Sequence, residues 1–516
     1  PMTTKQFLLC NPMLRISLVF ILGIVTTYYL GAELPPFFWQ TMIISTIVAF
    51  FFFRSREIMA SLLLFLCAFS VGGWRLHSMQ LEDERSIYSS SACYNAVVLD
   101  MPERHGKVVM APLMIMDGEW EGMKVQASFF ISESEKELKQ VTMGSWLGIN
   151  SELTNFKTST DSRLESYFKR LKCAGIVGKT FILPSNWQYC GKGVEFLSVF
   201  EQMKIKALKV RYGLLKQMEK VSGSNESKAI LKAVILGEKA SLSKSLRATY
   251  SQTGTSHLLA LSGLHLSVIF SLLLLLTRSL SSALIRACIV LASIWIYAFI
   301  VGLPVSVLRA AVMFSILTFI QLLNRKAFSL NSLSCAALVL LFANPLLLWD
   351  VSFQMSFLSV LAIFLFYPLF TVSLSPATSL IGRLFNAVIK MMMVSLSAQI
   401  GVAPLVLYYF GGFPTYFLLS NVIAVPVFIV VVYTAFVTLL GSVLYGKIIV
   451  LMTIACDLID KLNAVLRWIA KLPYAFIADV YIDELQVGLC YILIALLFWV
   501  AKICIKVYRS QIIAPY

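Results

Sequence analysis

Charged residues are scarce in this sequence, and acidic residues are the scarcest. Only 14% of the 516 residues are Asp, Glu, Lys or Arg, whereas a soluble protein carries about 25%. Hydrophobic residues take their place and make up 58% of the chain. This shortage of charge excludes a purely soluble enzyme and a disordered chain, and it predicts a polytopic α-helical membrane protein.

Histidine and paired cysteine are also rare. The chain has ten cysteines but no CxxC pair, and its four histidines are His77, His105, His257 and His265. Structural and catalytic metal sites need clusters of such ligands. We therefore expect no metal site, and no motif in the sequence calls for a cofactor.

Basic residues outnumber acidic residues by 43 to 27, which gives a net charge of +16. A strong positive balance favours anionic partners, here membrane lipids or an anionic substrate. The acidic residues are unevenly placed, because 18 of the 27 lie in residues 75–227. This concentration of charge predicts a soluble domain inserted in a membrane protein.

The chain opens with three hydrophobic runs near 14–30, 36–53 and 58–74. Each is close to the roughly 20 residues that cross a bilayer. Lys5, Arg15, Arg54 and Arg56 flank these runs, so the positive-inside rule places the amino terminus in the cytoplasm. We expect residues 1–74 to form three transmembrane helices and residues 75–227 to be exported.

Within the exported part, residues 75–190 are expected to form a small β domain. Short β-like segments recur near 93–100, 106–116, 122–131, 145–155 and 173–183. Five such strands suggest a barrel such as an OB-fold. The first and last strands of that barrel meet along a closing seam, which favours a disulfide between Cys93 and Cys190 and leaves Cys173 free.

Residues 191–252 are expected to form amphipathic interfacial helices. Apolar residues recur at steps of three and four between 195 and 220, which is typical of a helix that lies on a membrane surface. They are Phe196, Phe200, Met203, Ala207, Val210, Leu214 and Met218.

Residues 253–516 carry a closely spaced series of hydrophobic segments and are expected to form a transmembrane channel domain. Residues 448–472 are the ambiguous segment, because one face of that predicted helix is apolar and the opposite face carries Asp460, Lys461, Asn463 and Arg467. This segment is compatible with a membrane crossing, with an interfacial helix, or with the lining of a water-filled path.

The sequence TGTSHLLALSGLH at 253–265 places two histidines and several small polar residues at the mouth of a hydrophobic run. In a continuous helix His257 and His265 would lie about 12 Å apart, too far to share one metal ion. The segment is consistent with a capped helix start. It is equally consistent with a polar stretch lining a pathway, because polar groups at membrane depth face protein or water.

Arg309 lies several residues inside a predicted span that follows Gly302-Leu303-Pro304. An arginine at the centre of a membrane helix costs about 2.5–3.5 kcal/mol, so it should face protein or water. Two interpretations stay open: a structural ion pair with Asp350, and a functional group that binds phosphate through its planar fork.

At this point the chain resembles the ComEC family, the inner-membrane channels of natural competence that import single-stranded DNA. The resemblance rests on seven features: LKAVILGEK at 231–239, TGTSHLLALSGLH at 253–265, GLPVSVLRA at 302–310, NP at 344–345, SFQMSF at 352–357, Pro404, and NVIAVP at 421–426. It implies a bacterial inner-membrane protein that passes single-stranded DNA from the exported side to the cytoplasm.

The resemblance also implies a set of DNA-facing residues. The path for the strand would be lined by His257, Ser262, Gly263, His265, Ser306, Arg309, Gln354 and Asn421. The exported domain would contact DNA through Lys157, Lys169, Arg170 and Lys172. Expected partners are membrane lipids, a DNA receptor and a cytoplasmic ATPase or helicase. The ATPase must be a separate protein, because the Walker-like segment at 173–180 has Cys173 in place of its first glycine and is not expected to bind ATP.

One departure concerns nuclease chemistry. Many family members carry an HxHxDH run of a metallo-β-lactamase-like domain, and this sequence has none. We therefore expect no enzymatic activity and a separate nuclease partner. Two rival functions stay open: a transporter of another anionic polymer or lipid-linked saccharide, and a membrane-embedded transferase that uses His257 or His265 as a base.

Overall fold

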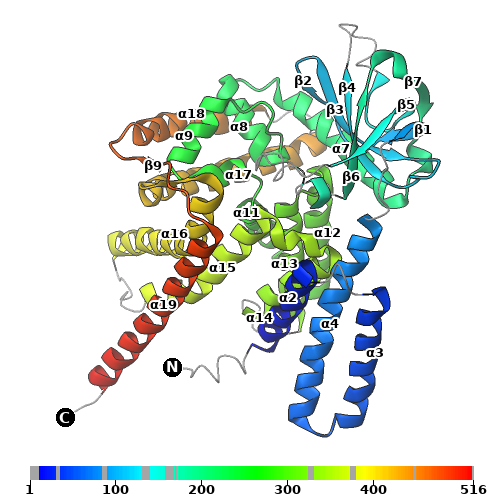
Figure 1. Cartoon of the computed structure of the whole chain (residues 1–516). Helices are drawn as coiled ribbons and strands as arrows, with labels where there is room; N and C mark the ends of the chain where they lie inside the picture. The colour runs from blue at the N-terminus through cyan, green and yellow to red at the C-terminus, as the bar shows by residue number, and fades with distance from the viewer. Residues whose placement is uncertain are drawn as a thin grey trace.

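The structure is a computed structural model of the chain. It describes residues 11–30, 35–83, 90–130, 140–156, 168, 171–173, 175–323, 330–371, 379–445 and 449–513. A small β barrel stands beside a large assembly of helices, and α3, α4 and α19 extend from that assembly away from the barrel (Figure 1). The expected fold class, a polytopic helical membrane protein with an inserted small barrel, is confirmed.

Eight helices in the described part of the chain are long and apolar enough to cross a membrane. They are α2 (Pro12–Leu30), α4 (Glu57–Asp83), α12 (Ala283–Ile300), α13 (Val305–Leu322), α15 (Val351–Phe370), α16 (Leu380–Phe410), α17 (Phe417–Tyr445) and α19 (Glu484–Ile513). Shorter apolar helices are α3 (Pro36–Phe53), α11 (Gly263–Leu276) and α14 (Leu330–Ala343). The chain is therefore a multi-pass membrane protein.

Glycines let α2 and α4 pack unusually close. A Cβ atom added to Gly23 would lie 2.1 Å from the carbonyl oxygen of Phe69, and one added to Gly72 would lie 2.3 Å from that of Phe20. Small residues at such contacts are a common way for membrane helices to associate. This pair then packs against α14, with Leu76, Phe20 and Leu341 in the shared core.

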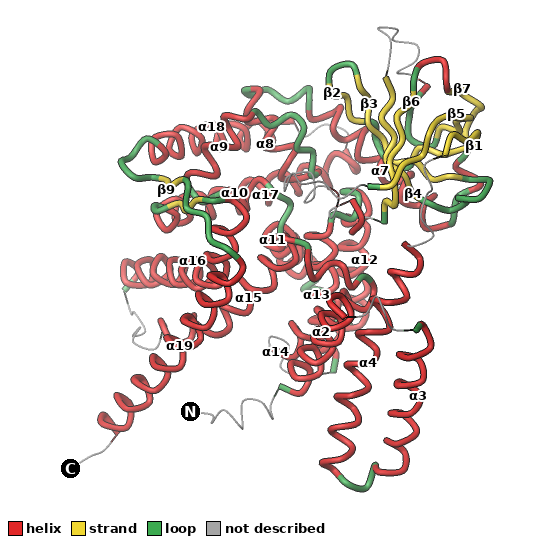
Figure 2. Tube along the Cα trace, viewed as in Figure 1, coloured by secondary structure: helices red, strands yellow, loops and turns green. Residues whose placement is uncertain are grey.

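The inserted region between α4 and α7 forms a closed barrel of five strands. Figure 2 shows these strands in yellow. The hydrogen-bonded order is β1-β3-β4-β6-β5, and β5 pairs back to β1 to close the ring. The pairing of β4 with β6 is parallel and the others are antiparallel, which is the topology of an OB-fold. The strands are β1 (Ser90–Val98), β3 (Val108–Ile115), β4 (Lys124–Phe130), β5 (Ser145–Asn155) and β6 (Ile176–Ile182), with β2 (Glu103–His105) and β7 (Trp187–Lys192) added to β3 and β5.

Alternation along each strand fills the barrel. In β3 and β4 every second residue is buried, which is the pattern of a sheet with one face in a core. Leu113, Val125 and Leu147 are fully buried there. Three hydroxyl groups form hydrogen bonds with one another inside the barrel, since Ser151 Oγ lies 2.9 Å from Tyr94 Oη and 2.7 Å from Thr180 Oγ1. Burial raises the pKa of Tyr94, so this phenol stays protonated.

The disulfide expected between Cys93 and Cys190 is not formed, and both cysteines are free thiols, as is Cys173. The reason is the strand order. β1 and β7 both pair with β5 and lie on opposite sides of it, so Cys93 and Cys190 are separated by a whole strand. Two strand spacings are about 10 Å, whereas a disulfide needs Cα atoms about 4.4–6.8 Å apart.

Four helices follow the barrel: α7 (Val199–Met218), α8 (Asn225–Leu236), α9 (Lys244–Gln252) and α10 (Ser256–Leu259). The segment 191–252 was expected to lie at the membrane surface as a whole, but α8 differs. Residues 229–236 are buried except for Lys232, and they belong to the main core of the helical assembly. Surface placement therefore remains a proposal for α7 alone.

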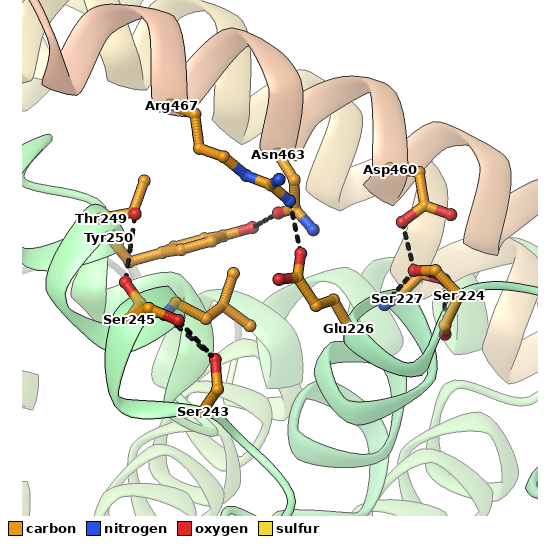
Figure 3. A network of polar contacts seen from close by, with 11 residues as sticks. Ser224, Glu226, Ser227, Ser243, Ser245, Thr249, Tyr250, Asp460, Asn463 and Arg467 are labelled. Carbon is orange, nitrogen blue, oxygen red and sulfur yellow. Dashed lines mark hydrogen bonds and ion pairs between the residues drawn. The ribbon is translucent and has the colours of Figure 1, made fainter.

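The ambiguous segment forms helix α18 (Ile449–Ala470), whose polar face packs on α8 and α9. Figure 3 shows this contact. Ser224 Oγ donates to Asp460 at 2.6 Å, Tyr250 Oη donates to Asn463 Oδ1 at 2.8 Å, and Arg467 pairs with Glu226. Protein side chains therefore bind Asp460, Asn463 and Arg467, whereas Lys461 on the same helix is exposed.

A two-stranded ribbon ties together distant parts of the chain. β8 (Gly412–Pro414) follows α16 and pairs with β9 (Phe476–Ala478), which precedes α19. Side chains reinforce the ribbon, since Thr415 Oγ1 donates to the carbonyl of Tyr474 at 2.6 Å. The hairpin of α17 and α18 therefore begins and ends at the same place.

Candidate functional site

The histidine-containing segment is a broken helix. Helix α10 ends at Leu259, Ala260 and Ser262 have extended backbone, and α11 begins at Gly263. The continuous helix assumed from the sequence is wrong at this point. Irregular backbone at membrane depth is tolerated where it is buried in protein or lines a water-filled cavity, so the break marks a specialised position.

Ser262 and His265 cap the second half of this broken helix. The backbone N–H of Ser262 donates to His265 Nδ1 at 3.1 Å, and Ser262 Oγ lies 2.9 Å from the same nitrogen. Because Nδ1 accepts, a neutral ring carries its proton on Nε2. That nitrogen is buried and has no hydrogen-bond partner among the described residues, and the ring lies beside a small apolar space lined by Val268, Phe428 and Val432. The side chain of His257 is exposed, whereas that of His265 is buried.

A second break separates α12 from α13. Gly302 and Leu303 adopt left-handed conformations with φ of 88° and 56°, and Pro304 precedes the first turn of α13. A left-handed leucine is strained by about 1–3 kcal/mol, which surrounding contacts must offset. Ser306 provides one such contact, since its hydroxyl donates to the carbonyl of Leu261 at 2.6 Å. The two breaks are therefore joined directly.

Arg309 is buried one turn further along α13, with 4% of its surface exposed. Its guanidinium donates to the backbone carbonyl of Ser352, and Nη2 also donates to Ser352 Oγ at 3.2 Å. Its Nε has no hydrogen-bond partner in the part of the chain that the structure describes. The ion pair with Asp350 is not formed, because Asp350 instead caps α15 by accepting from the N–H of Phe353 at 2.7 Å.

The short helix η4 (Pro345–Trp349) leads into α15 and forms a third irregular junction. Gln354 holds it, since Nε2 donates to the carbonyl of Leu348 at 2.9 Å and Oε1 accepts from the hydroxyl of Tyr409 at 3.0 Å. Asn421 is buried on α17, and within the described ranges neither its Oδ1 nor the hydroxyl of Ser420 has a hydrogen-bond partner. Polar groups thus gather where helices break, which is how membrane transporters build their substrate paths.

The family model described as "Competence protein" matches residues 234–503, which is just over half of the chain. The chain belongs to this competence protein family. It is 26% identical over 242 residues to ComE operon protein 3 of Bacillus subtilis, which covers 47% of this chain and 30% of that protein. It is 29% identical over 227 residues to Recombination protein 2 of Haemophilus influenzae, a match that covers 42% of this chain and 28% of that protein. The matches thus span less than a third of each curated relative, and no solved structure matches the chain.

The competence domain contains all three helix junctions and every residue that the sequence analysis assigned to the path. The structure joins Ser306 to the Leu261 carbonyl in the first break, and it joins Gln354 to α16. Sequence reasoning did not single out Ser352, Tyr409 or Ser420. Ser352 lies in the SFQMSF motif and could have been found there, whereas nothing in the local sequence marks Tyr409 as the partner of Gln354.

Side-chain hydrogen bonds near the end of α14 join the competence domain to the barrel region and to α4. Asn344 Nδ2 donates to the carbonyl of Cys173 at 2.9 Å, just before strand β6. Arg75 of α4 donates to the carbonyls of Phe342 and Ala343 at the end of α14. The NP motif thus anchors the barrel to the membrane helices. Of the proposed DNA contacts in the barrel region, Lys157, Lys169 and Arg170 lie outside the described residues, and Lys172 is exposed.

The surroundings of His265 do not favour a role as a catalytic base. A catalytic histidine needs an orienting group and a free nitrogen within reach of the substrate. Nδ1 of His265 accepts the cap hydrogen bonds and Nε2 faces apolar side chains. Among the described residues no group of three His, Cys, Asp or Glu side chains could hold a metal ion.

Proposed function

We propose that this protein is a channel of the bacterial inner membrane that takes part in competence and imports single-stranded DNA into the cytoplasm. Membership of the competence family, a multi-pass architecture and a net charge of +16 support this proposal. Its exported portion is residues 75–227, and the path runs through the competence domain. The observation that carries the proposal is a buried arginine placed where helix breaks meet.

Arg309 has the chemistry to meet a phosphate. Its fork is held by the backbone carbonyl and hydroxyl of Ser352, with Nε unsatisfied. A phosphate is a stronger, charge-assisted acceptor than a carbonyl and binds the fork bidentately. The passing strand can therefore replace Ser352 as the partner of the arginine, one phosphate after another. His257, Ser262, Gly263, His265, Ser306, Gln354 and Asn421 are proposed as the other residues along the path.

The remaining components are supplied by other proteins in this proposal. A DNA receptor delivers the strand, a cytoplasmic ATPase or helicase pulls it, and a separate nuclease removes the second strand. Lys157, Lys169, Arg170 and Lys172 are proposed to guide DNA at the barrel. A transporter of another anionic polymer or lipid-linked saccharide is the second candidate, since Arg309 would bind any phosphate-bearing chain.

The test is uptake of labelled DNA in cells deleted for this gene and complemented with variants. We expect deletion and Arg309→Ala to leave DNA outside the inner membrane and to reduce cytoplasmic entry by about tenfold or more, the loss of roughly one charge-assisted contact. Arg309→Lys keeps the charge but not the planar fork, so its cytoplasmic DNA entry should lie between that of the wild type and that of Arg309→Ala. Arg467→Ala, an exposed arginine of the same domain, is the control and should transport normally.

Each variant must first be shown to reach the membrane at normal abundance. Unchanged cytoplasmic DNA in the deletion strain, without a second homologue, would reject the DNA channel and favour the transporter of another anionic polymer. Normal import by Arg309→Ala would reject the role of this arginine while leaving the channel itself standing.

A further inference from the structure

Helix α7 carries two separate apolar faces, and only one of them is covered by protein. We propose that the second face, together with its flanking lysines, is a docking surface for anionic phospholipids, and that it seats the barrel on the membrane. We call this face the α7 stripe and define it by Val199, Phe200, Met203 and Val210 of α7 together with Phe196, which ends the short 3-10 turn η3 (Val194–Phe196) before the helix. The proposal is independent of what the channel transports.

The covered face explains why α7 cannot simply rotate to hide the stripe. Ile205 and Leu208 are buried, Ile205 in the same cluster as Val97 and Leu99 of the barrel region. Lys124 of β4 forms an ion pair of 2.6 Å with the buried Glu201 on this side of α7. Helix α7 also packs on α12 (Figure 1), where Leu208 approaches Gly302. Both the barrel and the helical assembly therefore fix the orientation of α7.

The stripe points the other way and remains open. Phe196, Val199, Phe200, Met203 and Val210 are between 53% and 73% exposed. Within α7, Val199, Phe200 and Met203 have the spacing of one helix face, and Val210 follows on that face two turns later. A water-exposed row of five large apolar side chains is costly and usually marks a surface that meets a membrane or a partner.

The position of the stripe identifies the bilayer as its partner. The ring of Phe200 lies 5.6 Å from the ring of Phe299 in a T-shaped contact. Phe299 is next to the last residue of α12, a helix long and apolar enough to span the membrane. The stripe therefore starts where the hydrocarbon around α12 ends, at the depth that interfacial amphipathic helices occupy.

The charges beside the stripe select the lipid. On a helical wheel Lys204 and Lys206 flank the apolar row on either side, and Lys209 follows Lys206 away from it. Long lysine side chains can lay their methylene groups along an apolar surface while the ammonium group reaches the headgroups. Such lysines favour anionic lipids. A nucleic acid is a weaker fit, because the two rings of the stripe, Phe196 and Phe200, already pack on Trp146 and Phe299, and its other three residues offer no ring on which a base could stack.

Photo-crosslinking of the full-length protein in nanodiscs tests the proposal. A photoreactive amino acid is placed at Met203 or at Tyr212, which are similarly exposed, 53% and 48%, but lie on opposite faces of α7. Discs contain either phosphatidylcholine alone or a mixture with phosphatidylglycerol, and adducts are measured by mass spectrometry. We expect lipid adducts at position 203 and at least about fivefold fewer at position 212, with phosphatidylglycerol enriched in the mixed discs.

The combined Lys204→Gln, Lys206→Gln and Lys209→Gln variant tests the charge. It should remove the enrichment of phosphatidylglycerol while leaving adducts in neutral discs unchanged. Equal labelling at positions 203 and 212, or no lipid adduct at position 203, would overturn the proposal. Adducts with added single-stranded DNA in place of lipid at position 203 would overturn it too, and would make the stripe part of a DNA surface.

Discussion

The barrel and the competence domain are held together in different ways. In the barrel every strand pairs on both sides, because β5 returns to β1, and side chains fill the interior by simple alternation. In the competence domain helices pack around a large apolar core, and its helix breaks are tied by bonds from one side chain to a carbonyl. Ser306 to Leu261 and Arg309 to Ser352 are examples.

This difference shows where each part can change shape. A closed ladder of backbone hydrogen bonds is one cooperative unit, so the barrel opens as a whole or not at all. A helix break secured by one hydroxyl or one guanidinium can rearrange locally. The competence domain therefore places its polar groups where the backbone is least constrained, and the barrel acts as a rigid body beside it.

The largest loss of stability is expected from a cavity made in the barrel core. Leu113 is fully buried on β3, so Leu113→Ala should destabilise the barrel by about 2–5 kcal/mol. Hydrogen exchange of the full-length protein should then rise in all five barrel strands together, while α12 and α15 keep their protection. Faster exchange confined to β3 would contradict the single cooperative unit.

A smaller change is expected at the contact between α9 and α18. Tyr250→Phe removes the donor to Asn463 and leaves that buried amide unsatisfied, since its Nδ2 already lacks a partner. The cost should be about 1–3 kcal/mol, visible as faster exchange in α18 alone. Arg467→Gln breaks only the exposed pair with Glu226 and should cost at most about 1 kcal/mol. If hydrogen exchange in Tyr250→Phe rose as much in the barrel strands as in α18, the barrel and the competence domain would not be independent.

The smallest change concerns thiol reactivity and leaves the fold intact. Burial raises the pKa of the Cys173 thiol to about 11, with a further rise from the charge of Asp350. A raised pKa lowers the thiolate fraction at pH 8, so Cys173 should be alkylated on the order of tenfold more slowly than the exposed Cys93 and Cys190. Its rate should keep rising as the pH approaches 11. If Cys93 and Cys190 reacted only after a reductant was added, the result would support a disulfide between them.

The sequence predicted best what depends on periodicity. The strand expected at 145–155 coincides with β5, and the one expected at 122–131 contains β4, because alternation follows directly from the two-residue period of a strand. Strand β7 was missed, since most of its residues are exposed and it shows no alternation.

The site was predicted only in part. Ser306, Arg309 and Gln354 stood out as polar residues in apolar helices, and the structure gives each of them a defined partner. The break at 260–262 was missed because leucines on both sides suggest one continuous helix. Its signal was Ser262 followed by His265, an N-cap with a side chain three residues later that can return the hydrogen bond. Partners such as Tyr409 depend on tertiary packing and could not be read locally.

The β8–β9 ribbon has a consequence for how the chain is threaded through the bilayer. Because its two strands are hydrogen-bonded, the chain leaves α16 and enters α19 on the same side of the membrane. The intervening hairpin must then cross an even number of times, so α17 and α18 both span or both stay on that side. Helix α19 itself carries Glu484 at its start and Lys502 near its far end, which is the charge asymmetry that the positive-inside rule predicts for a span whose far end faces the cytoplasm.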